Sequence, residues 1–323
     1  MSGVEFPEPR GTGVAFVTGA GGFLGGATAA ALVGAGWRVA AFGPQRRFAE
    51  DHPDQAPEAW SEDAVDRAAL MAAADDLGAP EIIFHAAGGA SVAASVDDPE
   101  RDFRRTVESL GETLAFMLDG APDARLVYPS SAAVYGADKP GPIAETAPPD
   151  PISPYGRHKS MAEALIGEVH AQFGLDAVII RFFSVYGPGL RKQLLWELAG
   201  RLRDAPASLE LSGSGDEARD FLFIDDAVRL IGLMAARPPS RAPFEVNGGT
   251  GRAVMVREAA EGLCAALGSG TTIRFNGDVR AGDPRSLVAD PALAAELGFA
   301  PEVTFEEGLE RFAKWIGSQR RTT

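Results

Sequence analysis

The sequence predicts an α/β protein with a doubly wound parallel sheet and a smaller C-terminal α/β lobe. Over residues 13–182, short apolar segments alternate with segments that carry apolar residues at helical spacing. The first apolar segment also runs through a glycine-rich turn into an alanine-rich helix. Strict alternation of strands and helices is typical of a parallel sheet with helices on both faces. After Gly187 the alternation is lost, which indicates a second lobe.

The expected elements follow from this alternation. Strands are expected over 13–18, 37–42, 81–85, 125–130 and 176–182, and helices over 23–35, 64–76, 99–119 and 154–173. The segments PFEVNGGTG and TTIRF predict further short strands. Residues 1–12 are expected to form a loose leader, because they lack the basic and apolar regions of a signal peptide. We expect the sheet domain to comprise 13–186 and 223–247, and the second lobe 187–222 and 248–323.

Composition limits the class of partner and the compartment. The 323 residues carry a formal net charge of −15, with a sequence pI of about 4.8. This acidity disfavours a nucleic acid or an anionic membrane as partner. The single cysteine, Cys264, allows no internal disulfide, so a reducing cytoplasm is expected. No apolar run is long enough for a membrane span, and the four histidines are not spaced as in a metal site.

The turn after the first expected strand predicts a dinucleotide site. In VAFVTGAGGFLGG, glycines stand at Gly19, Gly22 and Gly25, between a strand and a helix that begins near Phe23. Glycine permits positive φ and a close approach of backbone to a ligand. The start of the following helix offers unpaired N–H groups and the positive end of the helix dipole to a pyrophosphate. The alternative is a tight turn that binds nothing.

A second motif predicts acid/base chemistry. In SPYGRHKSMAE, Ser153 is the expected N-cap and Pro154 the first helical residue. Tyr155 and Lys159 then share one helical face. An ammonium near a phenol favours the phenolate, so Lys159 is expected to lower the pKa of Tyr155. An isolated pair of this kind is more often structural, but the upstream segment LVYPSSAAVYG ends an expected strand with two serines, where α/β sheets bind ligands.

From about Val14 to Trp315 the chain resembles the extended short-chain dehydrogenase/reductase family, in its NAD(P)-dependent nucleotide-sugar epimerase/dehydratase branch. TGAGGFLG resembles the family's cofactor loop, SSAAVYG its serine strand and SPYGRHKSMAE its catalytic helix. Its C-terminal signatures resemble RFFSVYGPG, ARDFLFIDDAV, FEVNGGTG and RAGDPRSLVADPALAAELGFAP. The resemblance implies a Rossmann fold, bound NAD or NADP, a nucleoside-diphosphate sugar as substrate, and a homodimer paired through the helices at 99–119 and 154–173. The apolar stripe that suits such pairing can equally face the sheet; it comprises Phe103, Val107, Leu110 and Leu114.

By this resemblance, three residues do the chemistry. Ser131 orients the sugar hydroxyl, Tyr155 moves its proton, and Lys159 holds the nicotinamide ribose and polarises Tyr155. Strand alternation puts Ser130 and Ser131 on opposite faces, and the spacing to Tyr135 and the following glycine favours Ser131. The residues expected at the cofactor are Gly19, Gly22, Phe23, Leu24, Gly25, Ala86, Ala87, Tyr155 and Lys159.

The residues expected at the adenosine end of the cofactor match the family pattern less closely. Asp63 resembles an aspartate that contacts adenine, although it suits a helix N-cap equally well. At the end of the second strand, Gly43 stands where a carboxylate would bind the ribose hydroxyls of NAD, and Arg46 and Arg47 follow. Arginines at a strand end that lacks this carboxylate suit the 2′-phosphate of NADP, so either NAD or NADP is expected as the cofactor. The alternative is two solvated arginines in a loop.

Arginines are also the candidates for the substrate diphosphate. Arg219 and Arg280 match family positions, and arginine forks suit phosphate oxygens. Ser184 stands where the family commonly carries an asparagine, which puts that substrate contact in doubt. Arg191 is expected at the lip of the site, although a solvated helix start explains it equally well.

The reaction type is narrowed by two alanines. The family's 4,6-dehydratases place an acidic pair after the serine, whereas this chain has Ala132 and Ala133, which cannot exchange protons. Two activities remain: epimerisation through transient oxidation of a sugar carbon, usually C4, and NADPH-dependent reduction of a 4-keto sugar. A cofactor-binding regulatory protein without turnover is the third possibility, and the intact Ser131, Tyr155 and Lys159 disfavour it.

Overall fold

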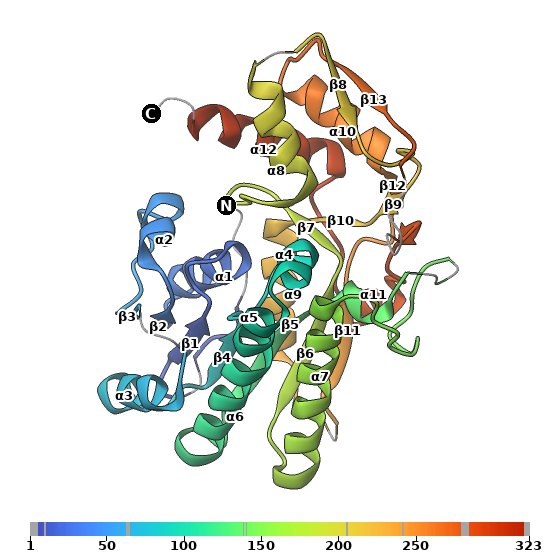
Figure 1. The fold of residues 1–323 in the computed structure, drawn as a ribbon. Helices are drawn as coiled ribbons and strands as arrows, with labels where there is room; N and C mark the ends of the chain where they lie inside the picture. Colours follow the sequence, from blue (N-terminus) through green and yellow to red (C-terminus); the bar gives the residue numbers. More distant parts are fainter. Residues whose placement is uncertain are drawn as a thin grey trace. The chain divides into compact units, whose positions relative to one another are not determined.

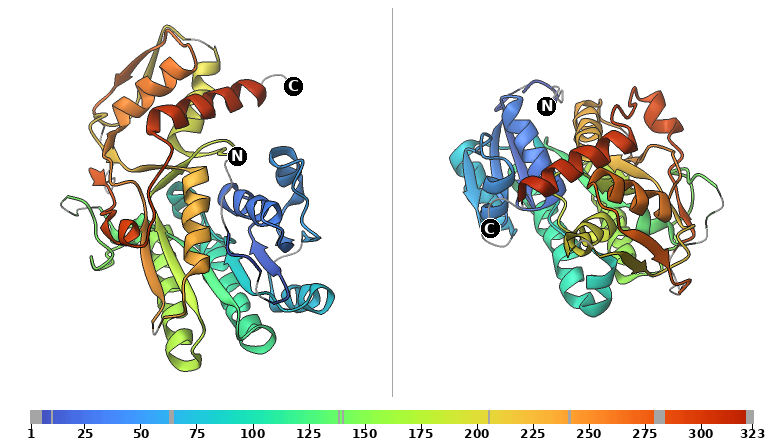
Figure 2. Two further views of the ribbon diagram at one scale, coloured as in Figure 1. Left: turned by 180° about the vertical axis from the view of Figure 1, so that it is seen from behind. Right: turned by 90° about the horizontal axis from the view of Figure 1, so that it is seen from above.

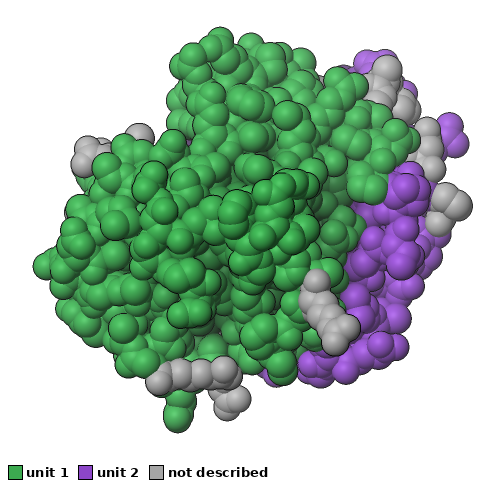
Figure 3. All heavy atoms as spheres, turned by 90° about the horizontal axis from the view of Figure 1, so that it is seen from below, with its two compact units in different colours: residues 1–134, 149–181, 228–246 green, residues 135–148, 182–227, 247–323 purple. Residues whose placement is uncertain are grey.

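The computed structural model describes residues 6–9, 11–62, 65–137, 139, 141–204, 206–240, 242–278 and 284–319, with backbone only for 45–47. The chain forms two compact units (Figure 3). Unit 1 comprises Met1–Val134, Pro149–Arg181 and Val228–Val246, and unit 2 comprises Tyr135–Pro148, Phe182–Ala227 and Asn247–Thr323. Segment 135–148, which the sequence placed in the sheet domain, thus clusters with unit 2. The domain boundaries expected from the sequence stay a prediction.

A seven-stranded sheet forms the centre of unit 1 (Figure 1). Its strand order is β11-β6-β5-β4-β1-β2-β3. The strands are β1 (Val14–Thr18), β2 (Arg38–Phe42), β3 (Ala59–Ser61), β4 (Ile82–His85), β5 (Arg125–Ser131), β6 (Ala177–Phe182) and β11 (Phe244–Gly248). From β3 through β2, β1 and β4 to β5 the neighbours pair in parallel. The strands expected over 13–182 are confirmed, whereas β3 is too short to give a pattern.

Helices cover both faces of this sheet, as the alternation predicts (Figures 1 and 2). α3, α6 and α7 lie side by side on one face, and α1 packs on β1, β2 and β4 from the other. The helices before β6 are α1 (Phe23–Gly34), α2 (Gln45–Asp51), α3 (Arg67–Leu77), α4 (Val92–Asp97), α5 (Pro99–Phe103), α6 (Ser109–Gly120) and α7 (Pro154–Phe173). A 3-10 turn, η2 (Ala132–Tyr135), follows β5, and α9 (Ile224–Ala236) precedes β11.

The helix expected over 99–119 is interrupted. Between α5 and α6 the chain forms a π-helical turn, η1 (Arg104–Glu108). Of the apolar stripe considered for dimer formation, Leu110 and Leu114 are buried in the core on their own sheet. Half of the stripe therefore faces inward, and a homodimer stays a prediction.

Alternating strand residues build the core beneath α3, α6 and α7. Phe16 of β1 stacks on Phe116 of α6 with ring centroids 5.7 Å apart, and Ile83 and Leu126 continue this layer across β4 and β5. In the N-terminal segment, Phe6 is buried and the Pro7 carbonyl accepts a 3.0 Å hydrogen bond from the Trp37 indole N–H. The described part of segment 1–12 therefore packs on unit 1.

Unit 2 consists of short strand pairs and helices. Its strands are β7 (Ser184–Tyr186), β8 (Ser208–Leu211), β9 (Ala218–Arg219), β10 (Phe221–Phe223), β12 (Val254–Met255), β13 (Thr272–Phe275) and β14 (Ser286–Leu287). Its helices are α8 (Gln193–Arg201), a 3-10 turn η3 (Leu202–Asp204), α10 (Val256–Ala266), α11 (Ala292–Glu296) and α12 (Phe305–Gln319). Buried Asp220 accepts hydrogen bonds from the backbone amides of Thr250, Gly251 and Ala289, which joins three loops.

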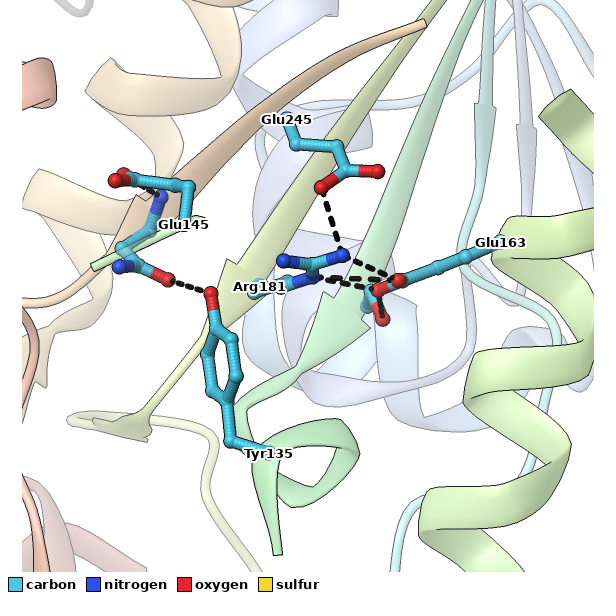
Figure 4. A network of polar contacts seen from close by, with 7 residues as sticks. Tyr135, Glu145, Glu163, Arg181 and Glu245 are labelled. Carbon is cyan, nitrogen blue, oxygen red and sulfur yellow. Dashed lines mark hydrogen bonds and ion pairs between the residues drawn. The ribbon is translucent and has the colours of Figure 1, made fainter. Parts of the chain in front are cut away.

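A second polar centre in unit 2 orders the segment after β5. The Tyr135 hydroxyl donates to the Asn247 amide oxygen at 2.8 Å (Figure 4). Asn247 in turn donates its side-chain NH₂ to the Ile143 carbonyl and its backbone N–H to Glu145, both at 2.8 Å. No helix in the described part of the chain is long and apolar enough to cross a membrane.

Candidate active site

The glycine turn between β1 and α1 packs tightly against the backbone of neighbouring segments. Gly19 has φ +67°, and a Cβ there would lie 2.5 Å from the Ala86 carbonyl carbon. A Cβ on Gly25 would lie 2.3 Å from the Gly19 carbonyl oxygen. Gly22 has an ordinary φ of −92° and is the N-cap of α1. The sequence pattern missed Gly21, where a Cβ would lie 2.1 Å from the Pro44 carbonyl oxygen. Only glycine therefore fits at positions 19, 21 and 25 without displacing backbone.

The start of α1 fits a pyrophosphate. No side chain caps the helix at Gly22, and its first turn contains no acidic residue. The amides of Phe23 and Leu24 belong to this uncapped first turn, which has N–H groups to offer an anion. The positive end of the helix dipole adds to that attraction. The residues present therefore suit the diphosphate of a dinucleotide.

The strand ends beside this turn are held by a buried histidine. His85 Nδ1 lies 3.1 Å from Thr18 Oγ1 and 2.9 Å from Thr113 Oγ1. Thr18 also accepts the N–H groups of Ala86 and Ala87, both at 3.1 Å. Burial, reinforced by the positive charge of Lys159, lowers the pKa of His85 to about 3. His85 is thus a neutral packing residue that orders the loop expected to line the cofactor.

This buried histidine predicts a pH-dependent stability. Between pH 6.5 and about 3 the unfolded chain binds a proton at His85 that the native protein does not bind. His85 therefore makes stability fall as pH falls through this window, and the expected loss between pH 7.0 and pH 4.5 is about 2.5 kcal/mol. Urea unfolding of His85→Gln at pH 7.0 and 4.5 is expected to show a smaller loss between the two pH values than wild type. Equal losses in both proteins would contradict the assignment.

The tyrosine motif lies at the start of α7, as predicted. Ser153 caps the helix by accepting the Gly156 N–H at 3.1 Å, and Pro154 is the first helical residue. The Tyr155 N–H donates to the Ser95 hydroxyl of α4 at 3.0 Å, a contact that the sequence did not indicate. α4 therefore helps to fix the position of Tyr155.

Ser131 and Tyr155 are joined by a side-chain hydrogen bond, which favours the phenolate. Burial has the larger, opposite effect on the phenol, and the carboxylate of Asp102 on α5 opposes ionisation as well, so the pKa of Tyr155 is raised. The expectation of a lowered Tyr155 pKa is therefore wrong. The buried Lys159 ammonium donates instead to the Pro129 carbonyl at 2.8 Å and lies 4.6 Å from the centre of the Tyr128 ring.

The two neighbouring serines of β5 have different surroundings, as strand alternation predicts. Ser130 is buried and donates to Glu163 of α7, whereas Ser131 is partly exposed and accepts the Ala133 N–H at 3.2 Å. Lys159 Nζ also lies 3.8 Å from the position of a Cβ on Gly88, in the loop after β4. The structure therefore brings Ser131, Tyr155 and Lys159 together beside the strand ends that carry the glycine turn. Their catalytic roles stay predictions.

The end of β2 has its own backbone requirement. Gly43 adopts φ +130°, its N–H donates to the Ser61 carbonyl at 2.8 Å, and its carbonyl accepts the Trp60 indole N–H at 2.6 Å. A side chain is strained at such a φ, so the absence of a carboxylate at position 43 has a structural cause. The glycine at position 43 therefore does not by itself favour a cofactor with a 2′-phosphate. The side chains of Arg46 and Arg47 lie outside the described part of the structure.

The remaining predicted residues divide between unit 2 and undescribed positions. In unit 2 the Ser184 N–H donates to the Asp220 carbonyl at 2.9 Å, and Arg191 packs 5.2 Å from the centre of the Trp315 ring. Arg219 donates to the Pro284 carbonyl at 2.8 Å. Arg280 and Asp63 lie outside the described residues; the N-cap of α3 is Asp66, which accepts the Ala69 N–H. The roles of these residues stay predictions.

Comparison with models of known protein families identifies the family of this chain. Residues 15–247 match the model of the NAD dependent epimerase/dehydratase family, a range that includes the glycine turn, both serines and α7. The chain is a member of this family. It is therefore an enzyme of the NAD-dependent epimerase/dehydratase family, of the extended short-chain dehydrogenase/reductase type, with a Rossmann-like sheet.

Named relatives of this family member cover most of its length. A probable UDP-glucuronate 4-epimerase of Rhizobium meliloti is 29% identical over 335 residues, covering 94% of this chain and 97% of the relative. A UDP-glucose 4-epimerase of Mycolicibacterium smegmatis is 32% identical and covers 73% and 76%. The crystal structure of Thermus thermophilus UDP-glucose 4-epimerase, a complex with NAD, superposes with a TM-score of 0.82 at 25% identity, covering 94% and 99%.

Proposed function

We propose that this family member is an NAD-dependent nucleotide-sugar 4-epimerase whose substrate is a UDP-hexose or a UDP-hexuronate. The observation that carries the proposal is the grouping of Ser131, Tyr155 and Lys159 within unit 1. This grouping adjoins the loop after β4, onto which the glycine turn closes. The relatives that carry the names of UDP-sugar 4-epimerases support the choice of substrate class. Ala132 and Ala133 support epimerisation over dehydration, since neither exchanges protons.

In the proposed mechanism the residues of unit 1 move one proton and hold the sugar. Tyr155, acting as the phenolate that its hydrogen bond with Ser131 favours, removes the proton of the sugar 4-hydroxyl and later returns it to the same oxygen. Ser131, hydrogen-bonded to Tyr155, orients that hydroxyl. The α1 N-terminus would hold the pyrophosphate of NAD, and bound NAD would supply the oxidation and the reversing reduction at the sugar carbon. Lys159 would bind the ribose beside the nicotinamide.

The test is direct turnover of matched substrate pairs. The purified protein is incubated with NAD and, separately, with UDP-glucose, UDP-galactose, UDP-glucuronate or UDP-galacturonate, and proton NMR follows the anomeric signals. We expect at least one pair to interconvert to the same equilibrium from both sides. If no pair changes, and the protein instead consumes NADPH with a 4-keto nucleotide sugar, it is the reductase.

A prediction about cofactor selectivity follows from the end of β2. Without a carboxylate at Gly43, no acidic side chain at this position repels a 2′-phosphate. We expect calorimetric dissociation constants for NAD⁺ and NADP⁺ to differ by less than about tenfold at low salt, with a ratio that changes as salt screens charge. A preference for NAD⁺ of more than tenfold at low salt would contradict this. Gly43→Asp is a poor test of selectivity, because φ is +130° there.

A further inference from the structure

A buried ionic cluster joins the strand and the helix that carry the proposed catalytic residues. Figure 4 shows Arg181 of β6 between Glu163 of α7 and Glu245 of β11. Arg181 contacts both carboxylate oxygens of Glu163, with distances of 2.7–3.2 Å, and Glu245 at 2.7 Å. Ser130 of β5 donates to Glu163 at 2.5 Å. The side chains of Arg181 and Glu163 are 4% and 7% exposed, so the pair is desolvated.

This cluster continues a contact already made by Lys159. Tyr155, Lys159 and Glu163 follow one another at intervals of four residues, so they lie along one face of α7. On β5, Pro129 accepts from Lys159, and the next residue, Ser130, donates to Glu163. Two successive turns of α7 are thus bonded to two successive residues of β5. Ser131 comes directly after these two residues.

Stability alone does not account for such an arrangement. The attraction within a buried ion pair is largely offset by the cost of removing both charges from water, so such pairs are weak evidence for stability. Their directional bonds do restrict geometry, because a carboxylate held by a guanidinium fork has a fixed orientation. Arg181 therefore holds the Glu163 carboxylate in place to receive the Ser130 hydroxyl.

We propose that Ser130 and Glu163 are positioning residues that set the distance between Ser131 on β5 and Tyr155 and Lys159 on α7. This inference rests on the proposed function, in which those three residues act on the sugar hydroxyl. Ser130 and Glu163 touch neither sugar nor cofactor in this account. They act through the backbone of the residues beside them.

The chain offers a matched control at the opposite end of β5. There Arg125 forms an ion pair with Asp176 that is also largely buried, with side chains 8% and 21% exposed and an Nε to Oδ2 distance of 2.7 Å. This pair also joins β5 to the segment that enters β6. In the described residues, the side-chain hydrogen bonds of Arg125 run to Asp176, to Met234 and Ala235 of α9 and to Arg237 rather than to α7. Loss of the pair is therefore not expected to change the relation of Ser131 to Tyr155.

The test uses a signal of Tyr155 that does not depend on turnover. The chain has four tyrosines, so labelling with carbon-13 at tyrosine Cζ gives few NMR signals, and the Tyr155 signal is the one lost in Tyr155→Phe. The Cζ shift responds to hydrogen bonding and ionisation of the phenol, whose charged and polar neighbours include Ser131 and Asp102. Ser130→Ala and Glu163→Gln are expected to move this signal. Ser130→Thr, which keeps the hydroxyl, and the control Asp176→Asn are expected to leave it near its wild-type position.

Kinetics supply the second readout. A misplaced acid/base residue slows the reacting complex, so Ser130→Ala is expected to lower kcat roughly ten- to hundredfold with KM unchanged. An unmoved Tyr155 signal in folded Ser130→Ala overturns the inference, even if Glu163→Gln proves too unstable to purify. A shifted signal in a protein whose wild type lacks epimerase activity keeps the positioning and overturns only the proposed function.

Discussion

Tyr155→Phe is expected to lower turnover by a factor on the order of 10² to 10⁴ while NAD stays bound. Phenylalanine keeps the ring but removes the hydroxyl that is bonded to Ser131. The proton of the sugar hydroxyl then has no acceptor of suitable strength. Steady-state epimerisation assays give the rate, and calorimetric titration with NAD gives the affinity.

The matched control for this prediction is another buried tyrosine. Tyr186 donates to the Phe305 carbonyl at 3.0 Å within unit 2, so Tyr186→Phe removes a hydroxyl of the same type from a structural position. We expect it to reduce stability by roughly 1 kcal/mol and to leave turnover nearly unchanged. If Tyr155→Phe turns over within a few-fold of wild type, Tyr155 is not the acid/base.

Gly25→Ala is expected to weaken NAD binding by a factor on the order of 10² to 10⁴. The new Cβ would lie 2.3 Å from the Gly19 carbonyl oxygen, so the turn must move away from α1. Loss of two hydrogen bonds to the charged pyrophosphate costs roughly 1.5–3 kcal/mol each. Calorimetric titration with NAD measures the change, and thermal unfolding confirms that the variant is folded.

Alanine substitutions at two other glycines of this region are expected to affect NAD affinity less than Gly25→Ala does. A Cβ on Gly22 would lie 3.1 Å from the same Gly19 oxygen, so Gly22→Ala is expected to cause a smaller loss. A Cβ on Gly34, at the last residue of α1, meets no atom within 4 Å. Gly34→Ala is expected to stabilise the protein by up to about 1 kcal/mol and to leave NAD affinity unchanged. Equal affinities across all three variants would remove the glycine turn from the cofactor site.

Local sequence signals predicted the frame of the site well. Ser153 and Pro154 identified the first turn of α7, because an N-cap and an N1 proline act within four residues. The split between Ser130 and Ser131 followed from strand alternation alone. The glycine spacing located the turn before α1, although the tightest approach, at Gly21 against Pro44, depends on a segment that is distant in sequence.

Long-range contacts account for what the sequence did not reveal. The pKa of Tyr155 is raised by burial and by the carboxylate of Asp102 on α5. The Lys159 ammonium donates a hydrogen bond to the carbonyl of Pro129, 30 residues upstream. Glu163 has the appearance of a solvated helix charge until Arg181 of β6 is placed beside it. The π-helical turn at Arg104–Glu108 has no local signal of this kind, and its Thr106 accepts the Gly89 N–H at 2.9 Å.

The central claim, transient oxidation at C4, is tested most directly by the fate of the hydrogen on that carbon. UDP-glucose and UDP-glucuronate carrying deuterium at C4 are incubated with the protein and NAD in ordinary water, and the products are examined by NMR and mass spectrometry. The account predicts C4-inverted product that retains the deuterium at C4, because the same hydrogen leaves and returns. Inverted product that has lost its deuterium to solvent would contradict the account, as would complete absence of inversion with both substrates.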